Sequence, residues 1–191
     1  NNIAGIYAQK KNYNEAINFF KKAILINPNL SEAHYNMGNS LFEVQKYNEA
    51  ISSYNQAIKI NPNYANAYNN LGNVFKALND LTNAINCYEK TIKIDGNNFN
   101  AYNNLSFLYC DIGKIENAYK CFEKLSKLKP DNILYKINNA LLLMPMYKSA
   151  KEIDIYRNKF LEGLKLIEKY NYNSDQPGNE IELNFYYLAY H

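Results

Sequence analysis

Apolar residues along most of the chain recur with helical spacing, in blocks separated by short polar turns. Two blocks form a unit of 34 residues that repeats, because Asn27-Pro28-Asn29 returns 34 positions later as Asn61-Pro62-Asn63. The segment from Ala33 to Asn39 returns from Ala67 to Asn73 at the same spacing, and a weaker copy begins at Ala101. Paired blocks at a fixed period predict antiparallel helix pairs stacked side by side, an all-α solenoid.

The period divides the chain into repeats and a different C-terminal part. The predicted parts, in order, are a partial repeat at 1–30, full repeats at 31–64, 65–98 and 99–132, a degenerate repeat with a long capping helix at 133–170, and a linker with an apolar tail at 171–191. Helices are expected near 1–10 and 14–26, as pairs within 31–60, 65–94 and 99–128, and then at 132–143 and 149–169.

Small and aromatic residues alternate at fixed sites of the repeat. An alanine is followed by an aromatic residue one helical turn later in each of four second helices: Ala16 and Phe20, Ala50 and Tyr54, Ala84 and Tyr88, Ala118 and Phe122. Glycine stands in two first helices, at Gly38 and Gly72, where we expect close helix packing. Proline ends three of the second helices, at Pro28, Pro62 and Pro130.

These sites together resemble the tetratricopeptide repeat (TPR), over residues 1 to about 132. The resemblance rests on an aromatic residue or histidine at the fourth site, glycine at the eighth, alanine at the twentieth, an aromatic residue at the twenty-fourth and proline at the thirty-second. It implies a right-handed superhelix whose first helices line a concave surface. It also implies that this surface binds protein, or a peptide in extended conformation.

A row of asparagines marks the sixth site of every first helix. The candidate peptide-binding residues are this row, Asn2, Asn36, Asn70, Asn104 and Asn138, and the polar neighbours Tyr35, Asn39, Asn69 and Asn73. A carboxamide both donates and accepts, so such a row suits the backbone of an extended peptide. The same side chains could instead hydrogen-bond between neighbouring repeats, and the sequence leaves both interpretations open.

Charge and composition argue against nucleic-acid binding, catalysis and metal binding by this chain. The net charge of +3, from 21 Lys+Arg and 18 Asp+Glu, gives no dense basic stripe, so no nucleic-acid partner is expected. The two histidines and the scattered acids form no catalytic or metal-binding spacing, and we expect no catalytic residue, metal or cofactor in this chain. No apolar run has the length of a signal or an anchor, and no membrane partner is expected. Homo-oligomerisation stays open.

The three cysteines show no disulfide or zinc spacing. Cys87 and Cys121 lie one repeat apart, which is too far for a bridge between stacked helices, so we expect buried thiols. Free thiols favour a reducing compartment, cytoplasmic or nucleocytoplasmic.

The C-terminal third departs from the repeat. Ser149 and Glu152 form a capping-box pattern, and an apolar stripe follows at Ile153, Tyr156, Phe160, Leu164 and Ile167. The segments 139–149, 152–164 and 185–191 resemble the connector of bacterial-type relatives of O-linked N-acetylglucosamine transferase and SPINDLY. That resemblance implies a nucleotide-sugar-dependent glycosyltransferase domain after His191, with the repeats as its substrate-recognition arm. The alternative is a stand-alone TPR scaffold that assembles a protein complex.

Overall fold

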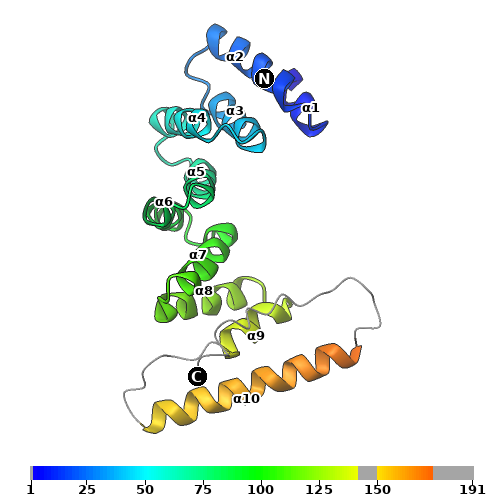
Figure 1. The fold of residues 1–191 in the computed structure, drawn as a ribbon, viewed down its shortest axis with the longest axis vertical. Coiled ribbons are helices and arrows are strands. Elements are labelled where there is room, and N and C mark those ends of the chain that lie inside the picture. Colours follow the sequence, from blue (N-terminus) through cyan, green and yellow to red (C-terminus); the bar gives the residue numbers. More distant parts are fainter. Residues whose placement is uncertain (1, 142–149, 174–191) are drawn as a thin grey trace. The chain divides into compact units, whose positions relative to one another are not determined.

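The computed structural model describes residues 2–141 and 150–173 of the chain (Figure 1). Within these ranges the chain is all-helical and contains no strand, as the sequence predicts. The helices are α1 (Asn2–Gln9), α2 (Tyr13–Ile26), α3 (Ser31–Glu43), α4 (Tyr47–Ile60), α5 (Ala65–Ala77), α6 (Leu81–Ile94), α7 (Phe99–Asp111), α8 (Ile115–Leu128), α9 (Ile133–Leu141) and α10 (Ala150–Asn173). The expected boundaries are confirmed to within a few residues.

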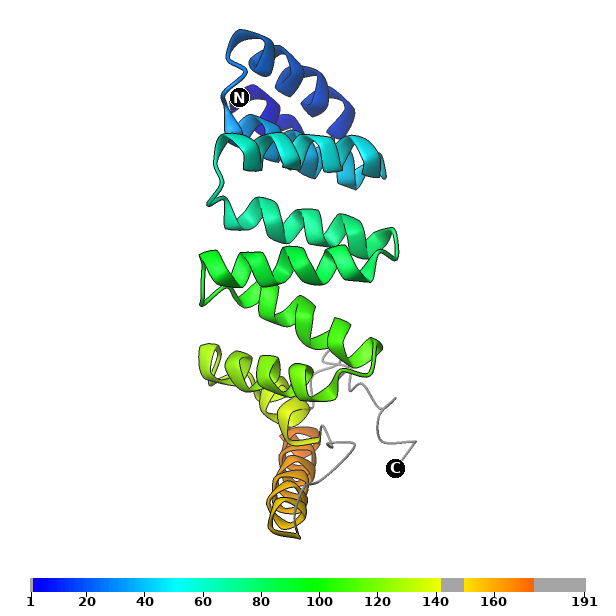
Figure 2. The same cartoon turned by 90° about the vertical axis from the view of Figure 1, so that its left-hand side faces the viewer.

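The chain divides within α7 into two compact units, Asn1–Ala101 and Tyr102–His191. In the first unit, each helix packs against the next along the chain from α1 to α6 (Figures 1 and 2). In the second unit, α8 packs against α9, and α9 packs against α10.

Local side-chain hydrogen bonds set where the helices begin and end. The Asn12 and Asp80 side chains accept the backbone N–H of Glu15 and Asn83 and so cap α2 and α6. After the second helices, Asn27, Asn61 and Asp95 each accept the N–H two residues further on, at 3.1, 3.2 and 3.2 Å. These turns explain why an Asn or Asp stands at 27, 61 and 95, whereas the fourth junction has Lys129 at this position. Asp95 closes the same turn even where Gly96 replaces the proline.

The alanine and aromatic sites form the core, as predicted. All four alanines are fully buried, and the aromatic residues that follow them are at most 2% exposed. The two core glycines are required by this packing. A Cβ atom on Gly38 would lie 2.7 Å from Cε1 of Tyr54, and one on Gly72 would lie 2.6 Å from Cε1 of Tyr88. Each tyrosine ring therefore rests directly on a glycine of its partner helix.

The aromatic core site holds tyrosine in two repeats and phenylalanine in two others, and the residue that faces it on the first helix differs accordingly. The two tyrosines face glycine, whereas Phe20 and Phe122 belong to repeats with Ala4 and Ser106 at the glycine site. The residue after the glycine is Asn39 or Asn73 in the tyrosine repeats, and each asparagine accepts a hydrogen bond from the tyrosine hydroxyl, at 2.7 and 2.8 Å. The hydroxyl thus needs both the glycine and the asparagine beside it.

The three cysteines are free and buried, as expected. Burial, with a smaller contribution from Asp80, raises the pKa of Cys87 to about 11. Burial also raises the pKa of Cys110 to about 12, helped by Asp111 and Cys121.

We therefore expect the thiols to react with Ellman's reagent only as the protein unfolds, because the thiolate is the reactive form. In the native protein at about pH 8, the thiol reaction should be at least tenfold slower than in denaturant. A thiol that reacts at the denatured rate in the native protein would show that its site is open to solvent.

The long helix α10 packs through a lysine and two tyrosines. The Lys159 ammonium donates to the Tyr119 hydroxyl of α8 and lies 5.4 Å from the centre of the Tyr156 ring. The predicted apolar stripe is partly wrong, because Ile153 and Leu164 are 41% and 42% exposed while Gly163 is buried. The packed face of α10 therefore centres on Tyr156, Lys159 and Gly163. The linker predicted from 171 is wrong at its start, because α10 continues to Asn173. The predicted cap at Ser149, the rest of the linker and the apolar tail lie outside the described residues.

Candidate functional site

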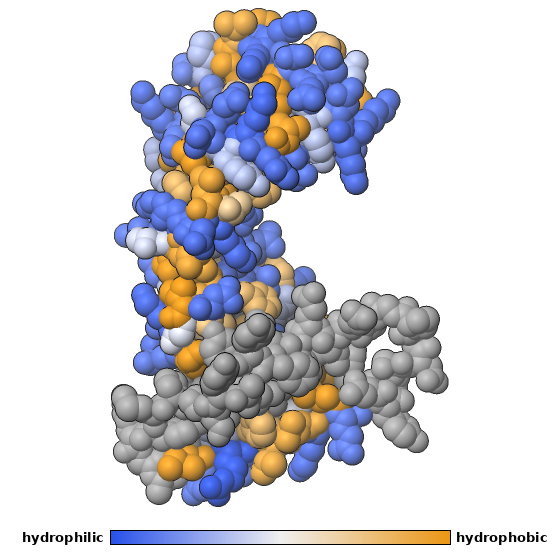
Figure 3. Space-filling model, in the orientation of Figure 1, coloured by the Kyte–Doolittle hydropathy of each residue, from blue (hydrophilic) through white to orange (hydrophobic). Residues whose placement is uncertain are grey.

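The first helices of the first unit, α1, α3 and α5, lie on one side of their second helices (Figure 1). We call the side of α1, α3 and α5 that points away from α2, α4 and α6 the first-helix face. The candidate residues of the first unit all belong to these three helices: Asn2 to α1, Tyr35, Asn36 and Asn39 to α3, and Asn69, Asn70 and Asn73 to α5. Asn104 and Asn138 belong to the second unit, in α7 and α9, where both are half-buried. Hydrophilic residues cover most of the first unit as seen in Figure 3.

Asn70 is tied to the preceding repeat. Its Nδ2 donates to Oδ1 of Asn39 at 2.8 Å and to the hydroxyl of Tyr35 at 3.1 Å. Oδ1 of Asn39 also accepts from the hydroxyl of Tyr54, at 2.7 Å. We call Tyr35, Asn39, Tyr54 and Asn70 the interrepeat cluster. Through the carboxamide of Asn70, hydrogen bonds in this cluster connect α3, α4 and α5.

Asn69 belongs with this cluster and not with the surface. Its side chain is only 6% exposed, and its Nδ2 donates to Oδ1 of Asn70 at 3.2 Å. Both Nδ2 and Oδ1 of Asn70 therefore form hydrogen bonds within the protein, and these fix the orientation of its side-chain amide. Its capacity to bind an incoming peptide is correspondingly reduced.

Asn36 occupies the same site one repeat earlier but has a different environment. The residue that corresponds to Asn39 in the preceding repeat is Gly5, which has no side chain to accept a hydrogen bond. Asn36 is half-buried, and its side-chain amide makes no hydrogen bond to any residue in the described ranges. The row therefore contains a carboxamide held by its neighbours at Asn70 and one that is available at Asn36.

Two tyrosine rings contact that of Tyr35, the residue that precedes Asn36 in α3. The ring of Tyr35 lies 4.9 Å from that of Tyr64 and 6.0 Å from that of Tyr54, measured between ring centres. Burial raises the pKa of Tyr64 to about 12, with smaller contributions from Tyr35 and Glu32. Burial likewise raises the pKa of Tyr54, with Tyr35 and Glu43 adding to the effect. The hydroxyls of Tyr54 and Tyr64 are therefore neutral hydrogen-bonding groups at neutral pH.

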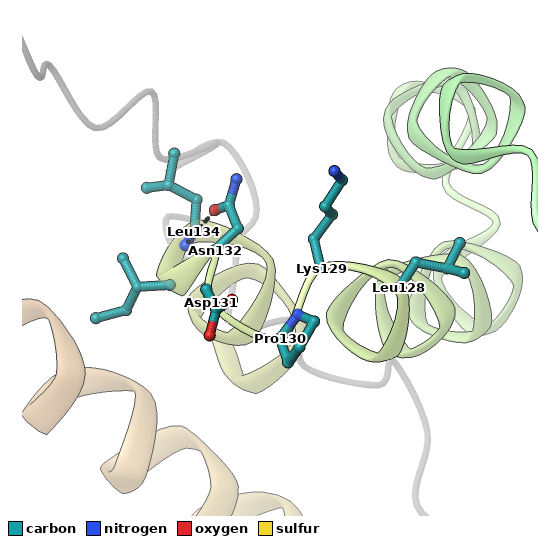
Figure 4. A pocket seen from close by; sticks show the side chains of 7 residues that line it. Leu128, Lys129, Pro130, Asp131, Asn132 and Leu134 are labelled. Carbon is teal, nitrogen blue, oxygen red and sulfur yellow. Dashed lines mark hydrogen bonds between the residues drawn. The ribbon is translucent and has the colours of Figure 1, made fainter.

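The second unit holds related but separate features. The Tyr135 hydroxyl of α9 donates to Oδ1 of Asn103 in α7 at 3.3 Å. A hollow of about 670 Å³ lies along the turn between α8 and α9, lined by residues 128–134 (Figure 4). The Asn132 side chain there accepts the backbone N–H of Leu134 at 3.0 Å. This hollow contains none of the asparagine row.

Sequence reasoning missed Tyr54, Tyr64, Glu32 and Glu43 as members of the site. The signal that could have found Tyr54 is its pairing with glycine and asparagine on the first helix, which both tyrosine repeats share. Among the described residues, no three His, Cys, Asp or Glu side chains come together as a metal-binding group. No helix of the described ranges is both long and apolar enough to cross a membrane.

Models of one repeat family match the chain. A "TPR repeat" model matches residues 5–45 and 38–79, and two "Tetratricopeptide repeat" models match 65–98 and 87–120. Together they cover well over half of the sequence. The chain belongs to the tetratricopeptide-repeat family. No curated protein matches it.

Solved structures share the TPR fold of this chain. A crystal structure of MamA has a TM-score of 0.71 and 24% identity, and the match covers 88% of this chain and 96% of MamA. MamA from Desulfovibrio magneticus RS-1 has a TM-score of 0.71 and 20% identity, covering 91% and 94%. YrrB, described as a TPR protein with an unusual peptide-binding site, has a TM-score of 0.67 and 18% identity, covering 91% and 85%. At these identities the likeness concerns the fold.

Proposed function

We propose that the first-helix face of this TPR protein binds a segment of polypeptide in extended conformation. The observation that carries the proposal is the side-chain amide of Asn36, which no group in the described ranges engages and which lies one residue from Tyr35 of the interrepeat cluster. A rigid cluster beside an available donor and acceptor reduces the ordering cost of binding. The peptide-binding site attributed to YrrB, which shares the fold, supports the same use of this fold.

The carboxamide chemistry favours the peptide backbone over a particular side chain. One amide can donate to a carbonyl and accept from an N–H of the same extended strand. Each such hydrogen bond contributes about 0.5–1.5 kcal/mol net, so several contacts are needed for useful affinity. Asn2 on α1 is exposed and lies one repeat before Asn36, where it can extend the row.

A comparison of Asn36 with a surface asparagine tests the proposal. Linear peptides are first selected from a displayed random library on the intact chain, and a selected fluorescent peptide is then titrated against the variants. Asn36→Ala should weaken its binding roughly 2- to 13-fold, the range that one net hydrogen bond gives. Asn55 is exposed on the second helix α4, and Asn55→Ala should leave affinity unchanged.

Thermal melting checks that both variants keep the stability of the parent protein. If no peptide is selected, or if Asn36→Ala binds as well as the parent, the first-helix face does not bind peptide through this amide. Equal weakening by Asn55→Ala would place the peptide on the second helices instead.

The more specific hypothesis is that this module is the substrate-recognition arm of an O-linked glycosyltransferase. What supports it is the connector-like sequence of the C-terminal third, of which 142–149 and 185–191 lie outside the described residues. The family models match the repeats alone. The parent reading frame tests it. A nucleotide-sugar site encoded after His191 would support the arm, and a stop codon soon after His191 would favour the stand-alone scaffold.

A further inference from the structure

We infer that the peptide bound at the first-helix face carries a lysine or arginine, whose cationic group lies against Tyr35 and Tyr64 and is attracted by the carboxylates of Glu32 and Glu43. This inference rests on the proposed function and specifies its ligand. It concerns one face of α3, which we call the α3 stripe: Glu32, Tyr35, Asn36, Asn39 and Glu43.

The stripe follows from helix geometry. Glu32, Asn36, Asn39 and Glu43 are spaced four, three and four residues apart in α3, so they lie one above another on the same side of the helix. Tyr35 adjoins Asn36 and turns its ring towards Tyr64 and its hydroxyl towards Asn70 of α5. The two carboxylates thus stand at opposite ends of a row of uncharged hydrogen-bonding groups, about 16 Å apart along the helix axis.

Both carboxylates are without a partner in the described residues. Glu32 and Glu43 are exposed and form no ion pair there, whereas Glu49, Glu116 and Glu123 each pair with a lysine close by in the sequence. The corresponding residues of the next repeat are Asn66 and Ala77, which carry no charge. The negative charge of the α3 and α5 surfaces is therefore concentrated on α3, next to the available Asn36 amide.

The tyrosine rings supply the second attraction for a cation. Aromatic faces bind ammonium and guanidinium groups, and a neighbouring carboxylate adds to this attraction. Elsewhere the protein fills such positions with its own lysines: Lys22 lies 5.1 Å from the centre of the Phe19 ring, and Lys90 lies 5.9 Å from that of Tyr68. Over Tyr35 and Tyr64, no lysine or arginine of the described ranges takes this place. Charge complementarity thus favours a basic side chain of the partner.

Sequencing of the peptides selected on the intact chain tests this inference. Lys and Arg should be enriched roughly two- to fivefold over the unselected library, the factor that an exposed cation–π contact gives. The double variant Glu32→Gln/Glu43→Gln should still select peptides, but with a lower enrichment of Lys and Arg, because the tyrosine rings remain while both carboxylates are gone. The matched control Glu49→Gln, which removes the same kind of charge from α4, should keep the enrichment.

The outcomes separate this inference from the proposed function. Selected peptides without excess Lys or Arg would overturn the basic-ligand inference and leave peptide binding intact. Enrichment as high in the double variant as in the parent protein would overturn the role of the two carboxylates. A library from which no peptide is selected would instead refute peptide binding itself. Because both glutamates are exposed, the double variant is expected to melt like the parent, and melting curves verify this.

Discussion

Replacing Gly72 with alanine should lower the free energy of unfolding by about 1–3 kcal/mol, the usual cost of forcing an extra methyl group into a packed core. The new Cβ atom would lie 2.6 Å from Cε1 of Tyr88, well inside van der Waals contact. The Tyr88 ring cannot move freely, because its hydroxyl donates a hydrogen bond to Oδ1 of Asn73 at 2.8 Å. The clash should outweigh the gain of about 1 kcal/mol that alanine brings to a helix interior. Urea unfolding followed by circular dichroism measures the change.

Gly5 provides the matched control, since it is also helical but an added Cβ atom there would meet no atom of a neighbouring element within 4 Å. Gly5→Ala should therefore leave the free energy of unfolding unchanged or raise it by up to about 1 kcal/mol. Tyr88→Phe frees the ring from Asn73, so Gly72→Ala should cost less in that background. If Gly72→Ala stabilises the protein as Gly5→Ala does, the close contact between ring and glycine is not present in solution.

Replacing Asn70 with alanine should also lower the free energy of unfolding, by about 1–3 kcal/mol. The side chains that hydrogen-bond to the Asn70 amide would lose that partner while they stay partly or fully buried. Asn70 donates to Asn39 and Tyr35 and accepts from Asn69, so its removal affects three side chains on two repeats. Asn36→Ala removes the same group from the same site of the preceding repeat, where it has no partner among the described residues. Its effect should stay within about 0.5 kcal/mol.

The difference in the free energy of unfolding between Asn70→Ala and Asn36→Ala tests this interpretation, and chemical denaturation measures it directly. Equal destabilisation would mean that Asn36 is held between repeats like Asn70, and the asparagine row would then be architectural throughout. Two stable variants would mean that the interrepeat cluster contributes nothing to folding.

The fold was predictable because its determinants are local and periodic. Alanine at residues 16, 50, 84 and 118, with an aromatic residue one turn later, defines both the helix and its buried face. The repeat junctions are equally local, since Asn27, Asn61 and Asp95 each close a turn with the residue two positions on. Neither feature requires knowledge of which repeats come to lie next to each other.

The site was only partly predictable because its chemistry depends on pairs from different repeats. Asn36 and Asn70 are the same residue type at the same site of the repeat, yet the amide of Asn36 is available and that of Asn70 is hydrogen-bonded. The reason lies in the preceding repeat, where the facing position is Gly5 for Asn36 and Asn39 for Asn70. Asn69, expected on the surface, is buried because its amide turns towards Asn70. In α10 the repeat pattern ends, so the sequence gives no fixed site for the buried face, which includes Gly163 where the apolar pattern predicts Leu164.

Hydrogen exchange measured by mass spectrometry, with and without a selected peptide, tests peptide binding by the first-helix face most directly. Bound peptide should slow amide exchange in fragments from α3 and α5, with little change in fragments from α4 and α6, because the ligand contacts the first helices. Asn36→Ala should reduce this protection at the same peptide concentration. Protection confined to α4 and α6, or protection of α3 and α5 that is unaffected by Asn36→Ala, would contradict the assignment.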